Sequence, residues 1–334
     1  MAVQGPARMM SSGYELFLQS LLGVLGLLHA SAAWSYFSKE RGAVPWTVAW
    51  LLLTGGTIYG LPGYPVVSIS AFGVCLWLWT RWWTGIEALA ERHWVPEVEF
   101  QATGEITGEQ LTVRNVRNFD WLGKHDYVQR WETRTYDLGS LEAVDLFVCC
   151  WGDRRVAHLI VSFVFSNALS LAFSFETRRE TTERWTMIAG FMKSYELSLI
   201  AADERDVVRV RTNLRHERVW RYRLQLSAAM CRSLLRQYVG QMNDIARRPR
   251  FYNTLFRNCS TEVAQIVQAA GLRLPRNWRL LLPGFVPIYL HELGLIDNRQ
   301  PFAVIEAQAE VGAAAQAADR DPAFSQRIRQ GAAQ

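Results

Sequence analysis

The sequence predicts an α+β domain that follows a group of membrane helices, and three observations carry this prediction. Residues 14–83 are nearly free of charge, whereas the rest of the 334-residue chain holds most of its 36 Lys and Arg and 31 Asp and Glu. From about Val95, polar and apolar residues alternate in short runs with turn residues between them, as in β-strands. From Ala228 a helical period replaces this alternation. Strands followed by helices indicate a mainly antiparallel sheet.

Residues 1–93 are predicted to form a membrane anchor with about three helices. The first covers about 14–36 and is long enough for one crossing, which takes about 20 residues. The sequence GLPGYP at 60–65 interrupts a longer apolar stretch and predicts two further helices, at 44–60 and 65–83. A signal peptide is the alternative for the first helix, and a re-entrant hairpin for the short second one.

The basic residues beside these helices favour one orientation in the membrane. With three crossings, one side offers Arg8, while the other offers Lys39, Arg41, Arg81 and Arg92. Cytoplasmic loops carry the excess of Lys and Arg. This count therefore favours a cytoplasmic position for the domain that follows.

Residues 94–300 form the predicted globular domain. Its strands are expected at 111–116, 131–136, 143–151, 156–165, 169–177, 205–213 and 219–226. Its helices are expected at 228–246, 261–270 and 287–293. The Ala- and Gln-rich remainder, residues 301–334, is expected to be a weakly anchored helix whose last dozen residues are frayed.

Composition excludes several kinds of site. The five cysteines do not form a disulfide framework, because Cys75 lies in a membrane segment and Cys149 and Cys150 are adjacent. The sequence has no paired CxxC and no HExxH, so neither a metal nor another cofactor is expected. The net charge of +5 is thinly spread and forms no basic stripe. Nucleic acid is therefore not an expected partner.

Cys259 stands at the start of a predicted helix, within the run FYNTLFRNCST at 251–261. Asn258 before it is a favoured N-cap residue, and the apolar face of the helix begins only at Val263. The positive end of the helix dipole and the free N–H groups there favour a thiolate, the form in which cysteine is a nucleophile. The alternative is a small buried apolar residue, since free cysteines are often of that kind.

A cysteine nucleophile needs a base, and His158 is the best candidate. It lies in an apolar strand, a rigid support, whereas the other histidines lie in or beside membrane segments, in charged turns or on a late helix. A three-residue turn centred on Asn167 would place Glu176 beside His158, where it could orient the imidazole. A two-residue turn would point Glu176 to the other face of the sheet. The alternative role of His158 is that of a hydrogen-bonded core residue.

Several motifs accompany this pair. They are RNVRNFD (114–120), RWETRTY (130–136), AH (157–158), FSFE (173–176), AADERD (201–206), FYNT (251–254), NC (258–259) and WRLLLPG (278–284). The order of His before an Asn-Cys helix start resembles the circularly permuted papain-like proteins related to NlpC and lecithin:retinol acyltransferase. The motifs between about 113 and 297 resemble the periplasmic domain of the Lnb-type bacterial lipoprotein N-acyltransferases. One departure is Ser260, where a threonine is expected.

This resemblance implies a permuted papain-like fold and a thiol acyltransferase without a cofactor. The acyl donor would be a phospholipid, and the acceptor would be the α-amino group of a lipoprotein's lipidated N-terminal cysteine. Cys259 would be the acyl-accepting nucleophile, His158 the base and Glu176 the orienting group. The resemblance also implies a multi-pass protein of the bacterial inner membrane with a periplasmic catalytic domain, contrary to the count of basic residues.

Three residues around the nucleophile are expected to support the reaction. Asn258, Tyr252 and Asn253 are candidates for stabilising the oxyanion or for positioning the thiol, together with the backbone N–H of Cys259.

Two other classes of function fit the same residues. A cell-wall amidase or peptidase on this scaffold would use water as its second acceptor and would need a polar cleft. A non-catalytic interaction domain in the membrane would use an arginine-rich surface for headgroups or a partner. The arginines that could form it are Arg114, Arg117, Arg130, Arg134, Arg209 and Arg211.

Overall fold

The computed structural model describes residues 6–37, 43–186 and 189–330, and the chain divides into two units. The first comprises Met1–Leu89 and Thr181–Tyr195, and the second comprises Ala90–Glu180 and Glu196–Gln334. The predicted boundary at residue 93 is therefore slightly late. The predicted separate part at 301–334 belongs to the second unit, because its helices pack against the sheet described below.

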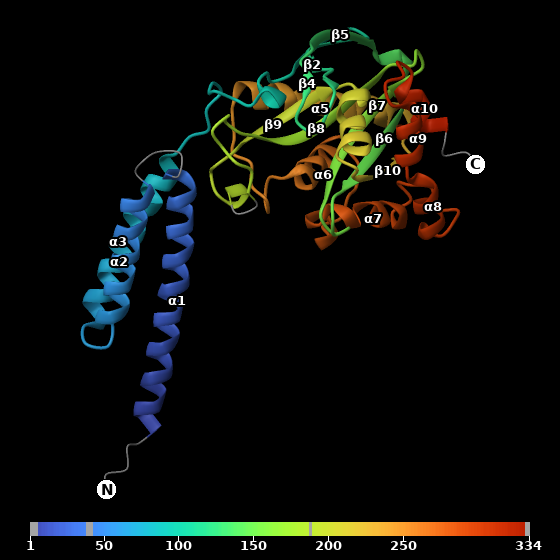
Figure 1. Cartoon of the computed structure of the whole chain (residues 1–334). Helices are drawn as coiled ribbons and strands as arrows, with labels where there is room; N and C mark the ends of the chain where they lie inside the picture. Colours follow the sequence, from blue (N-terminus) through green and yellow to red (C-terminus); the bar gives the residue numbers. More distant parts are fainter. Residues whose placement is uncertain (1–5, 38–42, 187–188, 331–334) are drawn as a thin grey trace. The chain divides into compact units, whose positions relative to one another are not determined.

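The first unit contains α1 (Pro6–Phe37), α2 (Ala43–Gly60) and α3 (Pro65–Gly85), close to the three predicted helices (Figure 1). Gly26 allows α1 and α2 to approach, since a Cβ there would collide with the Thr54 side chain. Among the described helices, Gly13–Trp34 is the segment long and apolar enough to span a membrane.

The segment 181–195 belongs to this unit through Lys193, whose ammonium donates to the backbone carbonyls of Trp83 at 2.8 Å and Ile86 at 2.9 Å. Of the basic residues in the orientation count, Lys39 and Arg41 lie outside the described residues, as does the side chain of Arg8.

The second unit contains a mainly antiparallel sheet, as predicted. In its described residues the strand order is β1-β2-β9-β8-β7-β6-β10, with β5 paired to β2. The pairs are antiparallel except β2 with β9, which run parallel at Arg117↔Ala202. The strands are β1 (Thr103–Thr107), β2 (Gln110–Arg117), β5 (Trp131–Asp137), β6 (Leu141–Cys150), β7 (Ala157–Phe165), β8 (Ser170–Arg178), β9 (Glu196–Ala202) and β10 (Arg218–Arg223). A separate small hairpin joins β3 (Asp120–Trp121) to β4 (Tyr127–Val128).

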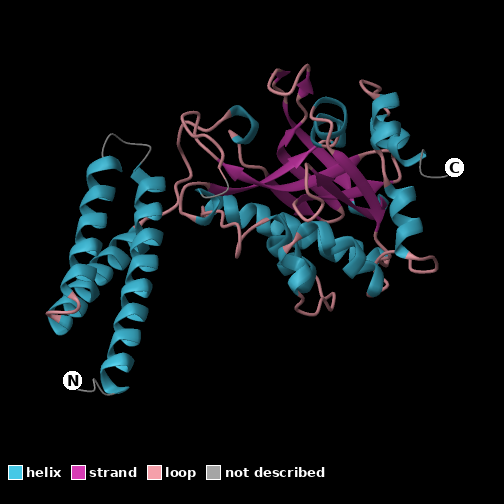
Figure 2. Cartoon of the chain, turned by 60° about the horizontal axis from the view of Figure 1, so that its bottom comes forward, coloured by secondary structure: helices cyan, strands magenta, loops and turns pink. Residues whose placement is uncertain are grey.

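Helices cover both faces of this sheet (Figure 2). They are α4 (Glu204–Val207), α5 (Ala228–Arg247), α6 (Cys259–Ala269), α7 (Val286–Glu292), α8 (Phe302–Ala309), α9 (Gly312–Ala318) and α10 (Phe324–Gln330). The apolar sides of α5, α6 and α7 pack on the face that carries Leu159 and Val161 of β7. α4, α9 and α10 pack on the opposite face, which carries Ile160. Alternate residues of β7 thus enter two different cores.

Two strand predictions fail for identifiable reasons. The strand predicted at 205–213 is wrong: α4 and the π-helical segment Val210–Leu214 occupy these residues. Asp203 starts α4 as an N-cap, its carboxylate accepting from the Arg205 N–H at 2.9 Å. Strand β9 was missed because its alternation of Glu196, Leu197, Ser198 and Leu199 is short and gives way to the apolar run 200–202, although every residue is buried.

The C-terminal prediction of a weakly anchored helix with a frayed end is also wrong as far as residue 330. Phe324 and Ile328 of α10 are fully buried in the core. The guanidinium of Arg329 bonds to the carboxylates of Asp145 at 3.0 Å and Glu204 at 2.5 Å, both of which are fully buried. Residues 331–334 lie outside the described part of the chain.

Several arginines assigned to a partner surface are structural instead. The Arg117 guanidinium binds the Asp206 carboxylate through two hydrogen bonds, of 2.8 and 2.9 Å. Asp206 also accepts from the Phe119 N–H and the Trp121 indole. Arg209 is buried and donates to the Trp121 carbonyl at 2.9 Å. Arg117 and Arg209 are therefore not available to a partner surface, because both are buried and bonded inside the fold.

We predict that Arg329→Met destabilises the second unit by about 3–5 kcal/mol, because it leaves the buried Glu204 carboxylate without its cation. Chemical denaturation of the detergent-solubilised full chain measures this change. The control is Arg327→Met on the same helix, where an exposed ion pair with Asp321 is lost. We expect the control to change the free energy of unfolding by less than about 0.5 kcal/mol. Equal effects of the two substitutions would contradict the buried pairing.

Candidate active site

The turn between β7 and β8 places Glu176 beside His158. The pair Ile160↔Ser174 has the register that a three-residue turn requires, and Ala168 closes the turn with a φ of 68°. One Glu176 oxygen, Oε1, lies 3.2 Å from Nε2 of His158. The two-residue alternative, which would point Glu176 to the opposite face, is therefore wrong.

The β7–β8 ladder ends just before these two residues. Its last pair is Ile160↔Ser174, although β8 continues to pair with β9 as far as Arg178. Cys259, the first residue of α6, lies at this point, and its thiol interacts with the His158 imidazole and with the backbone N–H of Leu159. The end of the ladder thus brings a thiol from a helix to a histidine on a strand.

A capping box fixes the start of α6. The Asn258 side-chain oxygen accepts from the N–H groups of Ser260 at 3.0 Å and Thr261 at 2.9 Å, and the Thr261 hydroxyl accepts from the Asn258 N–H at 2.9 Å. The Asn258 amide also donates to the Thr254 carbonyl at 2.6 Å. Asn258 therefore positions the start of the helix, with one of its two amide N–H groups held by the Thr254 carbonyl. The N–H of Cys259 has no acceptor among the described residues, as is usual for the first amide of a helix.

The other two predicted residues have different positions. Asn253 accepts from the N–H groups of Leu255 and Phe256, each at 3.0 Å, and so shapes the turn before the helix. Tyr252 is half-buried. Burial and the negative charges of Cys259 and Glu176 raise the pKa of its hydroxyl. Tyr252 is therefore a protonated donor near both groups.

The electrostatics favour a thiolate–imidazolium pair. Cys259 and His158 are only 6% and 8% exposed. Burial alone would raise the pKa of the Cys259 thiol, but its hydrogen bond with His158 and the imidazolium charge lower it. Burial likewise disfavours the imidazolium, yet the Glu176 carboxylate outweighs it and raises the pKa of His158 to about 9. The two shifts together favour an anionic sulfur beside a cationic ring.

Two further residues complete the network, and the sequence reasoning missed both. The Ser174 hydroxyl donates to Glu176 at 2.8 Å and lies 2.6 Å from Nε2 of His158. Its position two residues before Glu176, on the same face of β8, was a usable signal. Arg211 is buried and bonds to Glu176 at 3.4 Å and to Glu217 at 3.0 Å. Its earlier assignment to a partner surface is wrong, because it helps to hold the pKa of Glu176 below its usual range.

The remaining cysteines of the second unit are poor nucleophiles. Burial raises the pKa of the thiols of Cys149, Cys150 and Cys231. In the described part of the chain, no three His, Cys, Asp or Glu side chains are grouped as a metal site would require.

Residues 127–284 match the family model of the Lnb N-terminal periplasmic domain. The matched segment contains His158, Ser174, Glu176, Arg211 and Cys259. The match supports a relationship to the Lnb family. A periplasmic domain together with the apolar helix Gly13–Trp34 fits a membrane protein. No curated protein and no solved structure matches the chain.

We predict that iodoacetamide alkylates Cys259 at lower pH than an ordinary thiol, and that Glu176→Gln moves this reaction to higher pH. Removing the carboxylate lowers the pKa of His158, so the imidazolium that stabilises the thiolate is lost earlier as the pH rises. Mass spectrometry of the Cys259 peptide after short alkylation pulses measures the profile.

The matched control is Glu142→Gln on the exposed side of β6, which should leave the profile unchanged. Cys149 in the same digest serves as an unreactive internal standard. A Cys259 profile centred near the ordinary thiol pKa of about 8.5 in the unaltered protein would contradict the ion pair.

Proposed function

We propose that the protein is a membrane-bound lipoprotein N-acyltransferase of the papain-like type. It moves an acyl chain from a phospholipid, through a thioester on Cys259, to the α-amino group of a lipoprotein's lipidated N-terminal cysteine. The observation that carries the proposal is the contact of Cys259 with His158, backed by Glu176, inside the segment related to the Lnb periplasmic domain.

The first half-reaction forms the thioester. The Cys259 thiolate attacks the ester carbonyl carbon of the phospholipid, and the bond from this carbon to the glyceryl oxygen breaks. The His158 imidazolium gives its proton to the departing oxygen, so a lysophospholipid with a free hydroxyl leaves. Glu176 and Ser174 hold the ring through Nε2, which leaves Nδ1 for the exchange.

The second half-reaction transfers the chain. The amine nitrogen of the acceptor attacks the thioester carbonyl carbon, and the C–S bond breaks to form an amide. The neutral His158 takes a proton from the nitrogen, which restores the thiolate–imidazolium pair. In both halves the negative oxygen of the tetrahedral intermediate can accept from the free N–H of Cys259, with the Tyr252 hydroxyl as a second donor.

The surroundings of the thiol favour a lipid substrate over a cell-wall peptide. Leu255 and Phe256, in the turn that leads to the nucleophile, are 47% and 77% exposed. Large apolar side chains in such positions fit contact with acyl chains or a membrane surface. A peptidase would instead need polar groups there to bind the backbone of its substrate.

We further propose that the anchor crosses the bacterial inner membrane three times and leaves the catalytic domain in the periplasm. The relationship to a periplasmic domain supports the periplasmic side, whereas the count of basic residues favours the cytoplasmic side. A reporter fused after Gln334 that is active only in the periplasm tests the placement. Activity of a reporter that works only in the cytoplasm would refute it.

We predict that phospholipid vesicles leave an acyl chain on Cys259 of the detergent-solubilised full chain, seen by mass spectrometry as a hydroxylamine-labile adduct. Cys259→Ala should abolish the adduct and reduce lipoprotein N-acylation at least ~10³-fold. The control Cys231→Ala removes another buried thiol and should leave both the adduct on Cys259 and lipoprotein N-acylation unchanged. Survival of N-acylation in Cys259→Ala, in a strain that relies on this gene, would contradict the proposal.

A further inference from the structure

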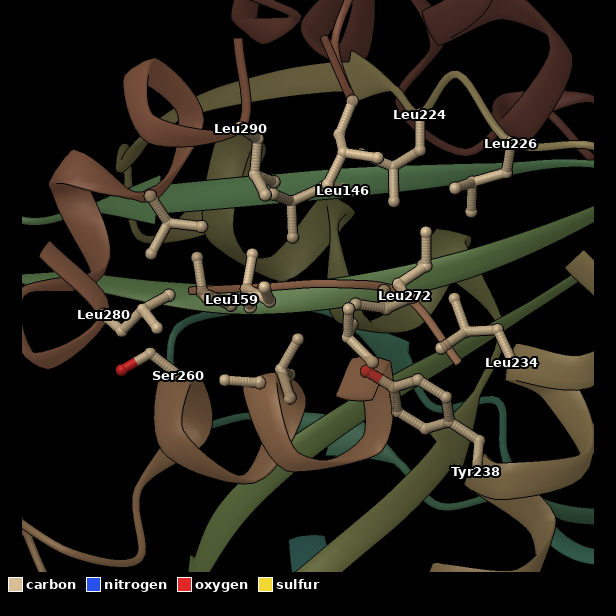
Figure 3. A pocket seen from close by; sticks show the side chains of 17 residues that line it. Leu146, Leu159, Leu224, Leu226, Leu234, Tyr238, Ser260, Leu272, Leu280 and Leu290 are labelled. Carbon is tan, nitrogen blue, oxygen red and sulfur yellow. The ribbon is translucent and has the colours of Figure 1, made fainter. Parts of the chain in front are cut away.

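An apolar cavity lies between the sheet and α6 (Figure 3). Seventeen residues line it, and all of them are aliphatic except Tyr238 and Ser260. They come from β6 and β7 on one side, from α5, α6 and α7, and from the connections between these elements. The proposed proton transfers use none of these side chains.

One end of the cavity meets the nucleophile. Ser260 follows Cys259 directly on α6, and Leu159 follows His158 directly on β7. Both Ser260 and Leu159 line the cavity. In Figure 3, Ser260 and Leu280 lie at one end of the cavity, and Leu234 lies at the other. A group bound to the Cys259 sulfur therefore starts one residue away from the lining of an apolar space.

The cavity has the form of a narrow slot along α6. Ser260, Val263, Ala264 and Val267 face it from one side of this helix, a span of about 10 Å at 1.5 Å per residue. The space inside the cavity that the centre of a water molecule can reach is ≈ 40 Å³. This is about three times what one water needs, at roughly 10–15 Å³ each. The slot thus has room for a few carbon atoms of an unbranched chain, and a longer chain requires its aliphatic walls to spread.

The chemistry of the lining selects the occupant. Apolar cavities stay dry and bind apolar molecules. A peptide would lose hydrogen bonds to water there without replacing them. The Tyr238 hydroxyl, a buried group without a partner among the described residues, is the polar exception in the interior of the lining.

We infer that this cavity binds the hydrocarbon chain of the acyl group carried by Cys259 and thereby sets which chain lengths are transferred. This inference rests on the proposed function, because it requires an acyl group on the thiol. Each methylene that the slot accepts favours binding by about fourfold. Ala264, the smallest aliphatic side chain of the lining, leaves the space at the middle of the slot.

The test uses the full chain in detergent with vesicles that contain phospholipids of mixed saturated chain lengths. Mass spectrometry of the Cys259 peptide gives the distribution of trapped chains. We expect Ala264→Leu, which fills the slot, to shift the distribution to shorter chains by about fourfold per excluded methylene. We expect Val267→Ala, which enlarges it, to shift the distribution to longer chains. The control is Gln265→Leu on the exposed side of the same helix.

The outcomes separate this inference from the proposed function. Adducts with the same distribution in Ala264→Leu and Val267→Ala as in the unaltered protein would overturn the inference and leave the proposed function standing. If Ala264→Leu does not fold, as judged by circular dichroism, Val267→Ala decides alone.

If the unaltered protein forms no adduct, the proposed function fails first. The cavity is then tested in Cys259→Ala by displacement of a fluorescent fatty acid with dodecanoate. Binding that weakens in the Ala264→Leu background supports an apolar chain site. Binding that does not change with Ala264→Leu refutes it.

Discussion

The charge of Glu176 is the feature on which the rest of the site depends. A carboxylate that is largely removed from water is costly unless cations and hydrogen bonds compensate it. His158, Arg211 and Ser174 supply that compensation. Because the carboxylate favours the protonated form of His158, the imidazolium in turn lowers the pKa of the Cys259 thiol. The reactive thiol on α6 is therefore a consequence of a charge balance that begins at Glu176 on β8.

The sheet explains why these groups can serve a lipid reaction. Successive residues of β7 point to opposite faces, so His158 lies with the polar network while Leu159 lines the apolar cavity. Cys259 contacts both neighbours at the end of the β7–β8 ladder. The thiol thus stands between proton-transfer groups on one side and a dry hydrocarbon-like space on the other. This arrangement keeps the charged groups that transfer protons apart from the hydrocarbon chain that is transferred.

The sequence indicated those parts of the site that depend on short-range rules. The capped start of α6 followed from Asn258, and one of the two turn lengths considered placed Glu176 beside His158, as the register of β7 with β8 has it. Arg211 could not be found in this way, because its segment alternates valine and arginine like a strand while it folds as a helical turn. The cavity was also beyond sequence reasoning, since its lining comes from several separate elements. The anchoring of α10 depends on Arg329 meeting carboxylates more than a hundred residues away.

The most direct test of this account is the titration of His158 in the full chain, followed by NMR of isotope-labelled histidine and assigned with His158→Gln. The account predicts that the ring keeps its proton up to a pH of about 9. It also predicts that Glu176→Gln moves the transition down towards the ordinary histidine value of about 6.5. A transition near 6.5 in the unaltered protein, unchanged by Glu176→Gln, would contradict the central claim that this carboxylate establishes the thiolate–imidazolium pair.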